Sequence, residues 1–180
     1  MAKRNDEVIN QILDSAQVLE GKDVLDVACG TGVLIPDYLE RKVKSVTAID
    51  IAPEMIKIAK KKYQEENVEF ICGDVETASF DSKFDCIVVY NAFPHFPEPE
   101  NLIRVSVSHL KEGGTLTIAH GMSKEQIDNH HIKWAAKVSN GLMGEEELAK
   151  MIQAYMPVTV KVSNHKMYQV TGCCIEEYVA

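Results

Sequence analysis

Short apolar runs alternate along the chain with segments in which apolar residues recur every three or four positions. The runs are nearly continuous, which is typical of strands buried on both faces, and occupy residues 23–28, 45–50, 68–74, 84–91 and 115–121. Segments with the spacing of an amphipathic helix occupy residues 8–19, which Gly21 is placed to end, 33–41, 53–63, 99–110 and 145–156. This alternation predicts an α/β fold in which helices cover both faces of a mainly parallel sheet.

The pattern changes in the last third of the chain. Residues 122–144 are polar and mixed, and we expect them to form an insertion on the substrate side. Residues 158–174 are typical of two strands with a turn near Asn164, which predicts an antiparallel pair. Because no linker, repeat or low-complexity tract interrupts the chain, residues 1–180 are predicted to form one domain, with residues 1–21 as its N-terminal helix.

Charge and hydropathy restrict the class of partner. The 19 Lys and Arg residues are outnumbered by 27 Asp and Glu residues, which gives a net charge of −8 and disfavours nucleic acid as a partner. The basic run at 57–63 has the pattern of a solvated helix face. The chain shows neither an apolar run of membrane-spanning length nor a secretory leader, and its five cysteines lack C-x-x-C spacing. We therefore expect a cytoplasmic protein that binds no membrane; the oligomeric state is not readable.

The stretch "VLDVACGTGVL" at residues 24–34 joins the first strand to the helix after it. Gly30 and Gly32 allow the backbone to approach a ligand closely, at the sheet edge where α/β proteins bind ligands. Ile35 stands where a dinucleotide fingerprint needs a third glycine, and the turn has no lysine for a phosphate loop. Asp26, just before the turn, would repel a pyrophosphate and favour a ligand that carries positive charge.

Carboxylates also end the next two strands. Asp50 is placed to accept hydrogen bonds from ribose hydroxyls, and Asp74 from the exocyclic amine of a base. Each aspartate alone has an ordinary explanation, as a strand-end cap, a helix cap or a turn residue. Together, in register with the glycine turn, they suit a cationic nucleoside such as S-adenosylmethionine.

At these motifs the sequence resembles the class I S-adenosylmethionine-dependent methyltransferases. The resemblance rests on "LDVACGTGVL", "AID", "CGDVE", "FDCIVVYNAFPHF" and "LKEGGTLTIAH", from about Asp23 to Ala119. It implies a Rossmann-like three-layer sandwich around a seven-stranded, mostly parallel sheet whose last strand is antiparallel. It also implies a cofactor site in which Asp26, Ala28, Gly30 and Gly32 border the methionine part, Asp50 and Ile51 hold the ribose with Met55 nearby, Asp74 and Val75 meet the adenine, and Asn91 and Ala92 pass beside the sulfonium.

The loop after the fourth strand is where the acceptor should arrive. Methyltransferases that act on base amino groups often carry Asn/Asp-Pro-Pro-aromatic there, whereas this chain has Asn91-Ala92-Phe93-Pro94, which counts against a nucleic-acid acceptor. Phe93 and Phe96 are predicted substrate contacts, and His95 is the candidate base because an unperturbed imidazole titrates near neutrality. The alternative is that His95 only shapes the loop.

Further histidines fall on the same side of the expected fold. His120 ends the fifth strand and is a second catalytic candidate, while His130, His131 and Trp134 are predicted substrate contacts in the polar segment. A metal held by His120 with His130 or His131 is conceivable, but no recognised ligand spacing supports it, so no metal is predicted.

The sequence thus favours a methyltransferase that moves a methyl group from S-adenosylmethionine to a small-molecule acceptor by in-line displacement. One alternative is a module that binds the nucleoside without catalysis, such as a sensor. A nicotinamide oxidoreductase is disfavoured by Ile35 and by the lack of a separate substrate domain. The nature of the acceptor atom stays open, because one framework can host oxygen, nitrogen, sulfur and carbon nucleophiles.

Overall fold

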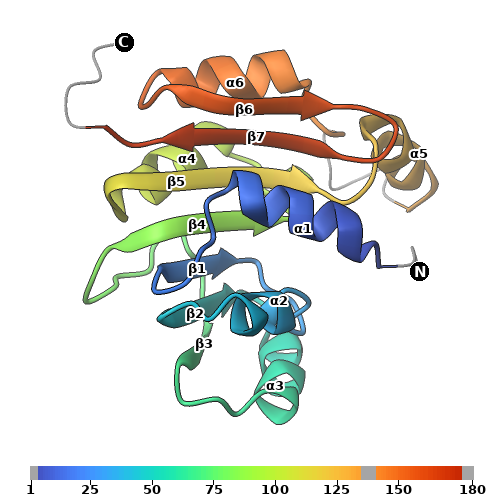
Figure 1. The fold of residues 1–180 in the computed structure, drawn as a ribbon. Helices are drawn as coiled ribbons and strands as arrows, with labels where there is room; N and C mark the ends of the chain where they lie inside the picture. The colour runs from blue at the N-terminus through green and yellow to red at the C-terminus, as the bar shows by residue number, and fades with distance from the viewer. Residues whose placement is uncertain (1–3, 135–140, 176–180) are drawn as a thin grey trace.

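A single seven-stranded sheet forms the centre of the protein, and helices cover both of its faces (Figure 1). The computed structural model describes residues 4–134 and 141–175. The strands follow the order β3-β2-β1-β4-β5-β7-β6. The predicted α/β sandwich, with a mostly parallel sheet and an antiparallel last strand, is therefore confirmed.

Five parallel strands are followed by an antiparallel hairpin at one side of the sheet. Strand β7 runs antiparallel to both β5 and β6, and all other neighbouring strands pair in parallel. The strands are β1 (Asp23–Val27), β2 (Ser45–Asp50), β3 (Val68–Cys72), β4 (Phe84–Tyr90), β5 (Leu110–His120), β6 (Val158–Ser163) and β7 (Tyr168–Cys173). The turn of the hairpin contains Asn164, as the sequence predicts; its side-chain oxygen accepts hydrogen bonds from the backbone N–H groups of Lys166 and Met167.

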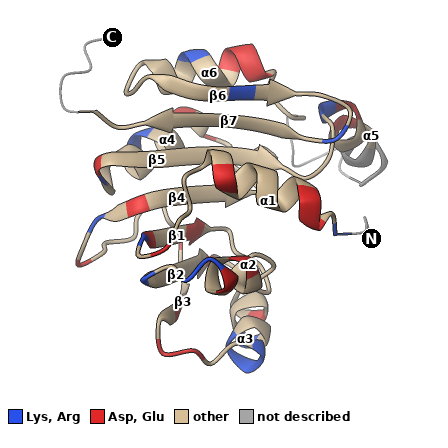
Figure 2. Ribbon diagram, viewed as in Figure 1, with Lys and Arg blue, Asp and Glu red and all other residues tan. Residues whose placement is uncertain are grey.

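The helices form the two outer layers. Apolar side chains of α1 to α3 pack on one face of the sheet, and those of α4, α5 and α6 pack on the other. The helices are α1 (Asp6–Ser15), α2 (Ile35–Glu40), α3 (Pro53–Lys62), α4 (Pro99–Ser108), α5 (Lys124–Trp134) and α6 (Glu145–Gln153), with a short 3₁₀ helix, η1 (Phe93–His95). Of the helices in the described ranges, none has the length and hydropathy that crossing a membrane requires. The basic residues of α3 lie on its solvent side, as expected (Figure 2).

Three predicted helix ends are wrong, and one of them is that of the helix expected over 145–156, which ends at Gln153. The first helix was expected to reach residue 19, but α1 ends at Ser15 because Gln17 adopts a left-handed backbone conformation (φ +59°), and Leu19 is 51% exposed. The helix expected over 99–110 ends at Ser108, and Leu110 instead pairs with Phe84 as the first residue of β5. Apolar spacing alone does not distinguish the last turn of a helix from the start of a buried strand.

A buried hydrogen-bond network fastens α1 to the sheet. Gln169 on β7 donates from Nε2 to the Ile12 carbonyl (3.3 Å) and to Oγ1 of Thr171 (3.0 Å). Its Oε1 accepts from the Ser15 hydroxyl (2.9 Å). Because the Gln169 side chain is fully buried, water would not replace these three hydrogen bonds if they were lost.

We expect Gln169→Leu to lower the free energy of unfolding by roughly 2–4 kcal/mol, because it removes three buried hydrogen bonds that are each worth about 1 kcal/mol. Urea unfolding followed by circular dichroism measures the change, with Gln11→Leu on the exposed side of α1 as the control. A loss below about 1 kcal/mol would show that the network does not anchor the helix.

Candidate functional site

A cavity of about 440 Å³ opens at the carboxyl ends of the first parallel strands. Its walls come from the ends of β1 and β2, the turn after β3, and the loop after β4. The predicted site residues among its lining are Ala28, Asp50, Ile51, Asp74, Val75, Ala92, His95 and Phe96. The tertiary structure therefore brings together residues from four separate segments, at the edge where parallel sheets bind ligands.

Asp50 joins the two backbone turns at the centre of this site. Its Oδ2 accepts the N–H of Gly30 (2.8 Å), and its Oδ1 accepts the N–H of Ala52 just before α3 (2.9 Å). The carboxylate thus helps to hold the glycine turn against the end of β2. Each carboxylate oxygen has a further lone pair, so Asp50 retains the capacity to accept hydrogen bonds from a ligand in the cavity.

The two glycines of the turn differ in how much space a side chain would have. Gly32 adopts φ +85°, and a Cβ there would lie 2.8 Å from the ring of Tyr63, so no other residue fits. Gly30 also has positive φ, but a Cβ there would meet nothing within 4 Å. Ala28, which lines the cavity, adopts the left-handed region as well (φ +55°), a strained conformation for a residue with a side chain.

Asp74 stabilises the turn after β3 and also lines the cavity. Its Oδ1 accepts the N–H of Glu76 (2.9 Å), and its carbonyl oxygen accepts the N–H groups of Thr77 and Ala78. The turn interpretation and the ligand interpretation are therefore compatible. A contact between Asp74 and the amine of a base stays a prediction.

Asp26 lies inside the strand, outside the cavity lining. Its side chain is only 2% exposed and faces the layer that contains α2. Burial raises the pKa of Asp26 to about 8; the Tyr38 hydroxyl on α2 acts in the opposite direction, and the charge of Asp50 adds to the rise. Asp26 is not among the residues that line this cavity, and its contact with the methionine part of a ligand stays a prediction.

The other predicted cofactor contacts lie around the rim. Asn91 has positive φ, and its Oδ1 accepts the N–H of Gly121 (3.0 Å), which joins the ends of β4 and β5. Met55 is 43% exposed on the first turn of α3, and Ile51 is 72% exposed at the cavity edge. These exposed apolar side chains could pack on a flat ligand surface.

The residues predicted to contact the methyl acceptor or to act in catalysis fall into three groups by position. His95 is exposed and lines the cavity, together with the half-buried Phe96, whereas Phe93 is buried. His120 is 3% exposed and contacts the ring of Tyr168 edge to face (6.0 Å between centroids), so it is not part of the cavity lining. The side chains of His130, His131 and Trp134 lie outside what the structure describes.

The metal alternative is not tested, because it needs His130 or His131, whose side chains lie outside the described part of the chain. Among the side chains that the structure does describe, at residues 4–129 and 141–175, no three metal-ligating groups lie together. The residues that line the cavity but that the sequence did not single out are Val27, Ile49, Gly73, Glu76 and Pro97. Glu76 stands two positions after Asp74, and Oε1 of Glu76 accepts from Asn101 at the start of α4 (2.7 Å). The motifs quoted from the sequence contain all of these positions except Pro97, which is set only by how the loop after β4 folds.

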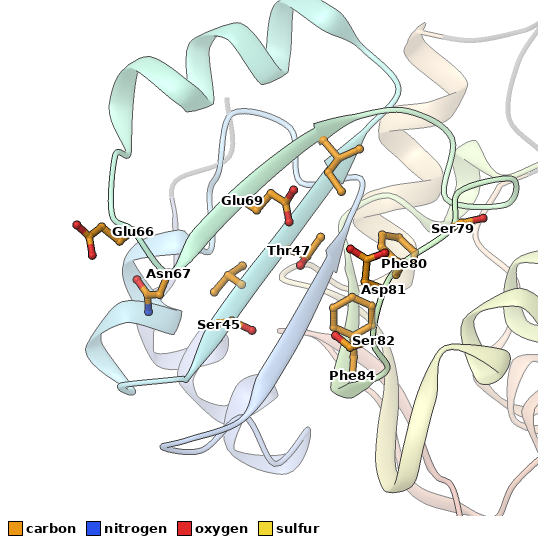
Figure 3. Close-up of a pocket in the computed structure, with 12 residues that line it drawn as sticks. Ser45, Thr47, Glu66, Asn67, Glu69, Ser79, Phe80, Asp81, Ser82 and Phe84 are labelled. Atoms are coloured by element: carbon orange, nitrogen blue, oxygen red, sulfur yellow. The ribbon is translucent and has the colours of Figure 1, made fainter.

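A second hollow of about 390 Å³ lies over β2 and β3 (Figure 3). Ser45, Thr47 and Glu69 line it, and Phe80, Asp81 and Phe84 face them from the connection to β4 and its first residue. It contains no predicted site residue. Asp81 is therefore a suitable carboxylate for control substitutions.

Comparison with known proteins agrees with this geometry. A family model described as a methyltransferase domain matches residues 24–114. The malonyl-[acyl-carrier protein] O-methyltransferase of Acetivibrio thermocellus is 38% identical over 122 residues, which cover 66% of this chain and 43% of that protein. The chain spans about half the length of the curated relatives it matches.

Solved structures show the same fold. An S-adenosylmethionine-dependent methyltransferase from Mesorhizobium loti aligns with a TM-score of 0.76 and 12% identity, over 91% of this chain and 96% of that chain. The N-methyltransferase NodS from Bradyrhizobium japonicum WM9, in complex with S-adenosyl-L-homocysteine, aligns with a TM-score of 0.71 and 18% identity, over 94% and 85% of the two chains.

The burial of Asp26 predicts an unusual pH dependence of stability. In the folded protein the carboxyl loses its proton near pH 8, whereas in the unfolded chain it does so near pH 4. Its contribution to stability is therefore complete below pH 4 and is lost as pH rises towards 8. We expect Asp26→Asn to gain stability relative to the wild type between pH 5 and 8.5, by at most about 4 kcal/mol.

Urea unfolding at the two pH values measures this difference, with Asp81→Asn as the control for removal of an exposed carboxylate. If Asp26→Asn and wild type keep the same stability difference at both pH values, Asp26 is already ionised in the folded protein at pH 5.

Proposed function

Because the chain belongs to the class I S-adenosylmethionine-dependent methyltransferase family, we propose that it moves a methyl group from S-adenosylmethionine to a small-molecule acceptor. The observation that carries this proposal is the single cavity that gathers Ala28, Asp50, Asp74, Ala92 and His95. Its volume of about 440 Å³ falls within the range of ligand sites in proteins.

The residues of the cavity fit the cofactor in shape and in charge. The open space at Gly30 leaves room for a ligand to approach the backbone, and Asp50 and Asp74 present oxygens that accept hydrogen bonds. We propose that Asp50 holds the ribose hydroxyls beside Ile51 and Met55, and that Asp74 and Val75 meet the adenine. The turn from Asp26 to Gly32 would border the methionine part, with Asn91 and Ala92 beside the sulfonium.

When bound, S-adenosylmethionine supplies a methyl group that is already activated by the positive charge on sulfur. The protein then has to align the acceptor opposite the sulfur atom and exclude water, which suits an in-line displacement. Phe93 and Phe96 supply apolar surface next to this position. His95, on the exposed rim of the same cavity, is the candidate base for an acceptor that must lose a proton.

A small-molecule acceptor is favoured over nucleic acid for two reasons. The net charge of −8 repels phosphate backbones, and the Asn91-Ala92-Phe93-Pro94 sequence departs from the motif of enzymes that methylate base amino groups. The malonyl-[acyl-carrier protein] O-methyltransferase relative acts on an acyl group rather than on nucleic acid. A nucleoside-binding sensor remains the alternative, and an acceptor screen that follows formation of S-adenosylhomocysteine separates the two.

Asp50→Asn tests the cofactor site. We expect the dissociation constant for S-adenosylmethionine to rise about 10- to 100-fold, because a charged acceptor for the ribose is lost and asparagine has only one acceptor oxygen for the N–H groups of Gly30 and Ala52. Isothermal titration calorimetry measures the affinity, with Asp81→Asn as the matched control. Equal affinities in wild type and Asp50→Asn would remove Asp50 from the site, and tight binding of NAD instead would overturn the proposed function.

His95→Ala tests the assignment of the base. We expect turnover to fall about 100-fold near neutral pH, and the dependence of the rate on pH to lose its acidic limb. His165→Ala, in the exposed turn of the β6–β7 hairpin, is the control. Near-normal turnover of His95→Ala across the pH range would leave His95 with only a role in shaping the loop.

A further inference from the structure

A second cavity next to the cofactor site has an apolar wall and a carboxylate. Its volume is about 220 Å³, and its lining includes Phe93, Pro94, Phe96, Pro99, Met143 and Glu147. Phe96 also lines the larger cavity, so the two cavities meet at this ring. Phe93, in the wall of the smaller cavity, directly follows Ala92 of the larger one, which is proposed to lie beside the sulfonium. Given the proposed function, the smaller cavity therefore lies near the reacting methyl group. We propose that it binds the acceptor, and that the acceptor is a small apolar molecule bearing an amine.

The charge of the surrounding surface favours a cation. Glu147 lies in the cavity wall, and Glu98 and Glu100 flank Pro99, a lining residue, at the start of α4. Figure 2 shows the acidic first turn of α6, which contains Glu145 to Glu147. Among the described residues that line the smaller cavity there is neither lysine nor arginine. Among these described residues, an acceptor with a carboxylate or phosphate next to its reacting atom would find no positive partner.

The two walls of the cavity are held in place by separate interactions. The N–H of Leu142 donates to Oδ1 of Asp128 on α5 (2.9 Å), which anchors the segment that carries Met143. Glu146, the neighbour of Glu147, pairs with Lys161 (2.6 Å) on β6, so the two glutamates face different surroundings. Aromatic faces such as that of Phe96 also attract ammonium groups, which adds to the attraction by Glu147.

Methyl transfer to an amine requires a proton acceptor and a leaving group. His95 or water would take the proton, and the sulfur of the cofactor is the leaving group. An ammonium group first loses a proton to His95 or to water, because only the neutral amine has a lone pair. The nitrogen then forms a bond to the methyl carbon while the carbon–sulfur bond breaks and its electron pair returns to sulfur. The product is a methylated ammonium ion and S-adenosylhomocysteine, and the product ion then releases a proton to solvent.

Binding of matched probes to protein saturated with S-adenosylhomocysteine tests this inference. The probes are 2-phenylethylammonium and phenylacetate, which share an aromatic body and carry opposite charges. We expect calorimetry to detect 2-phenylethylammonium, with phenylacetate at least about tenfold weaker. Glu147→Gln should weaken binding of the amine about fivefold, the size expected for an exposed ion pair, while Glu146→Gln changes it less than twofold.

Glu146→Gln controls for the general effect of removing a charge from the first turn of α6. Equal or tighter binding of phenylacetate, no binding of the amine, or equal losses in the two variants would overturn the inference while leaving the cofactor site intact. Failure of wild-type protein to bind S-adenosylhomocysteine at all would instead overturn the proposed function, and the inference with it.

Discussion

The site depends on how the Asp50 carboxylate joins two backbone turns. One oxygen holds Gly30 in the turn after β1, and the other holds Ala52 at the start of α3. Without this carboxylate, the glycine turn would be held mainly by backbone hydrogen bonds. The nearest of these run from the N–H of Gly32 to the carbonyl of Cys29 and from the N–H of Cys29 to the carbonyl of Ile49. Asp50 both orders the backbone of the turn and faces the cavity. A change that weakens the turn would therefore also change the shape of the proposed cofactor site.

Burial divides the three strand-end aspartates into two kinds. Asp50 and Asp74 line the cavity, where they can accept hydrogen bonds from a ligand. Asp26 lies below the turn, and burial raises its pKa so far that the carboxyl keeps its proton at neutral pH. The expectation that three carboxylates together suit a cationic nucleoside therefore rests mainly on Asp50 and Asp74. Asp26 would contribute charge only if a bound cation favoured its ionisation.

The proposed acceptor cavity is built differently from the proposed cofactor cavity. The proposed cofactor cavity is formed by strand ends and their first turns, which hydrogen bonds between backbone and carboxylates hold in place. The smaller cavity lies between residues 93–99 and residues 141–147, two parts far apart in sequence. Under the proposed function, one sheet would keep a constant methyl donor while the loops determine the acceptor.

Local patterns in the sequence determined much of the fold and the set of candidate site residues. Alternating apolar runs and amphipathic segments predicted the layered sheet, and the turn at Asn164 predicted the antiparallel hairpin, because both depend on side-chain periodicity and short-range turn chemistry. The motif residues at the strand ends were also found in this way, since parallel strands bring their carboxyl ends to one edge. Only the tertiary structure decided which of those residues are exposed to the cavity. It placed Asp26 under α2, His120 against Tyr168, and Leu110 in β5 rather than in a helix. These outcomes depend on burial and on pairing between distant segments, which periodicity along one segment does not encode.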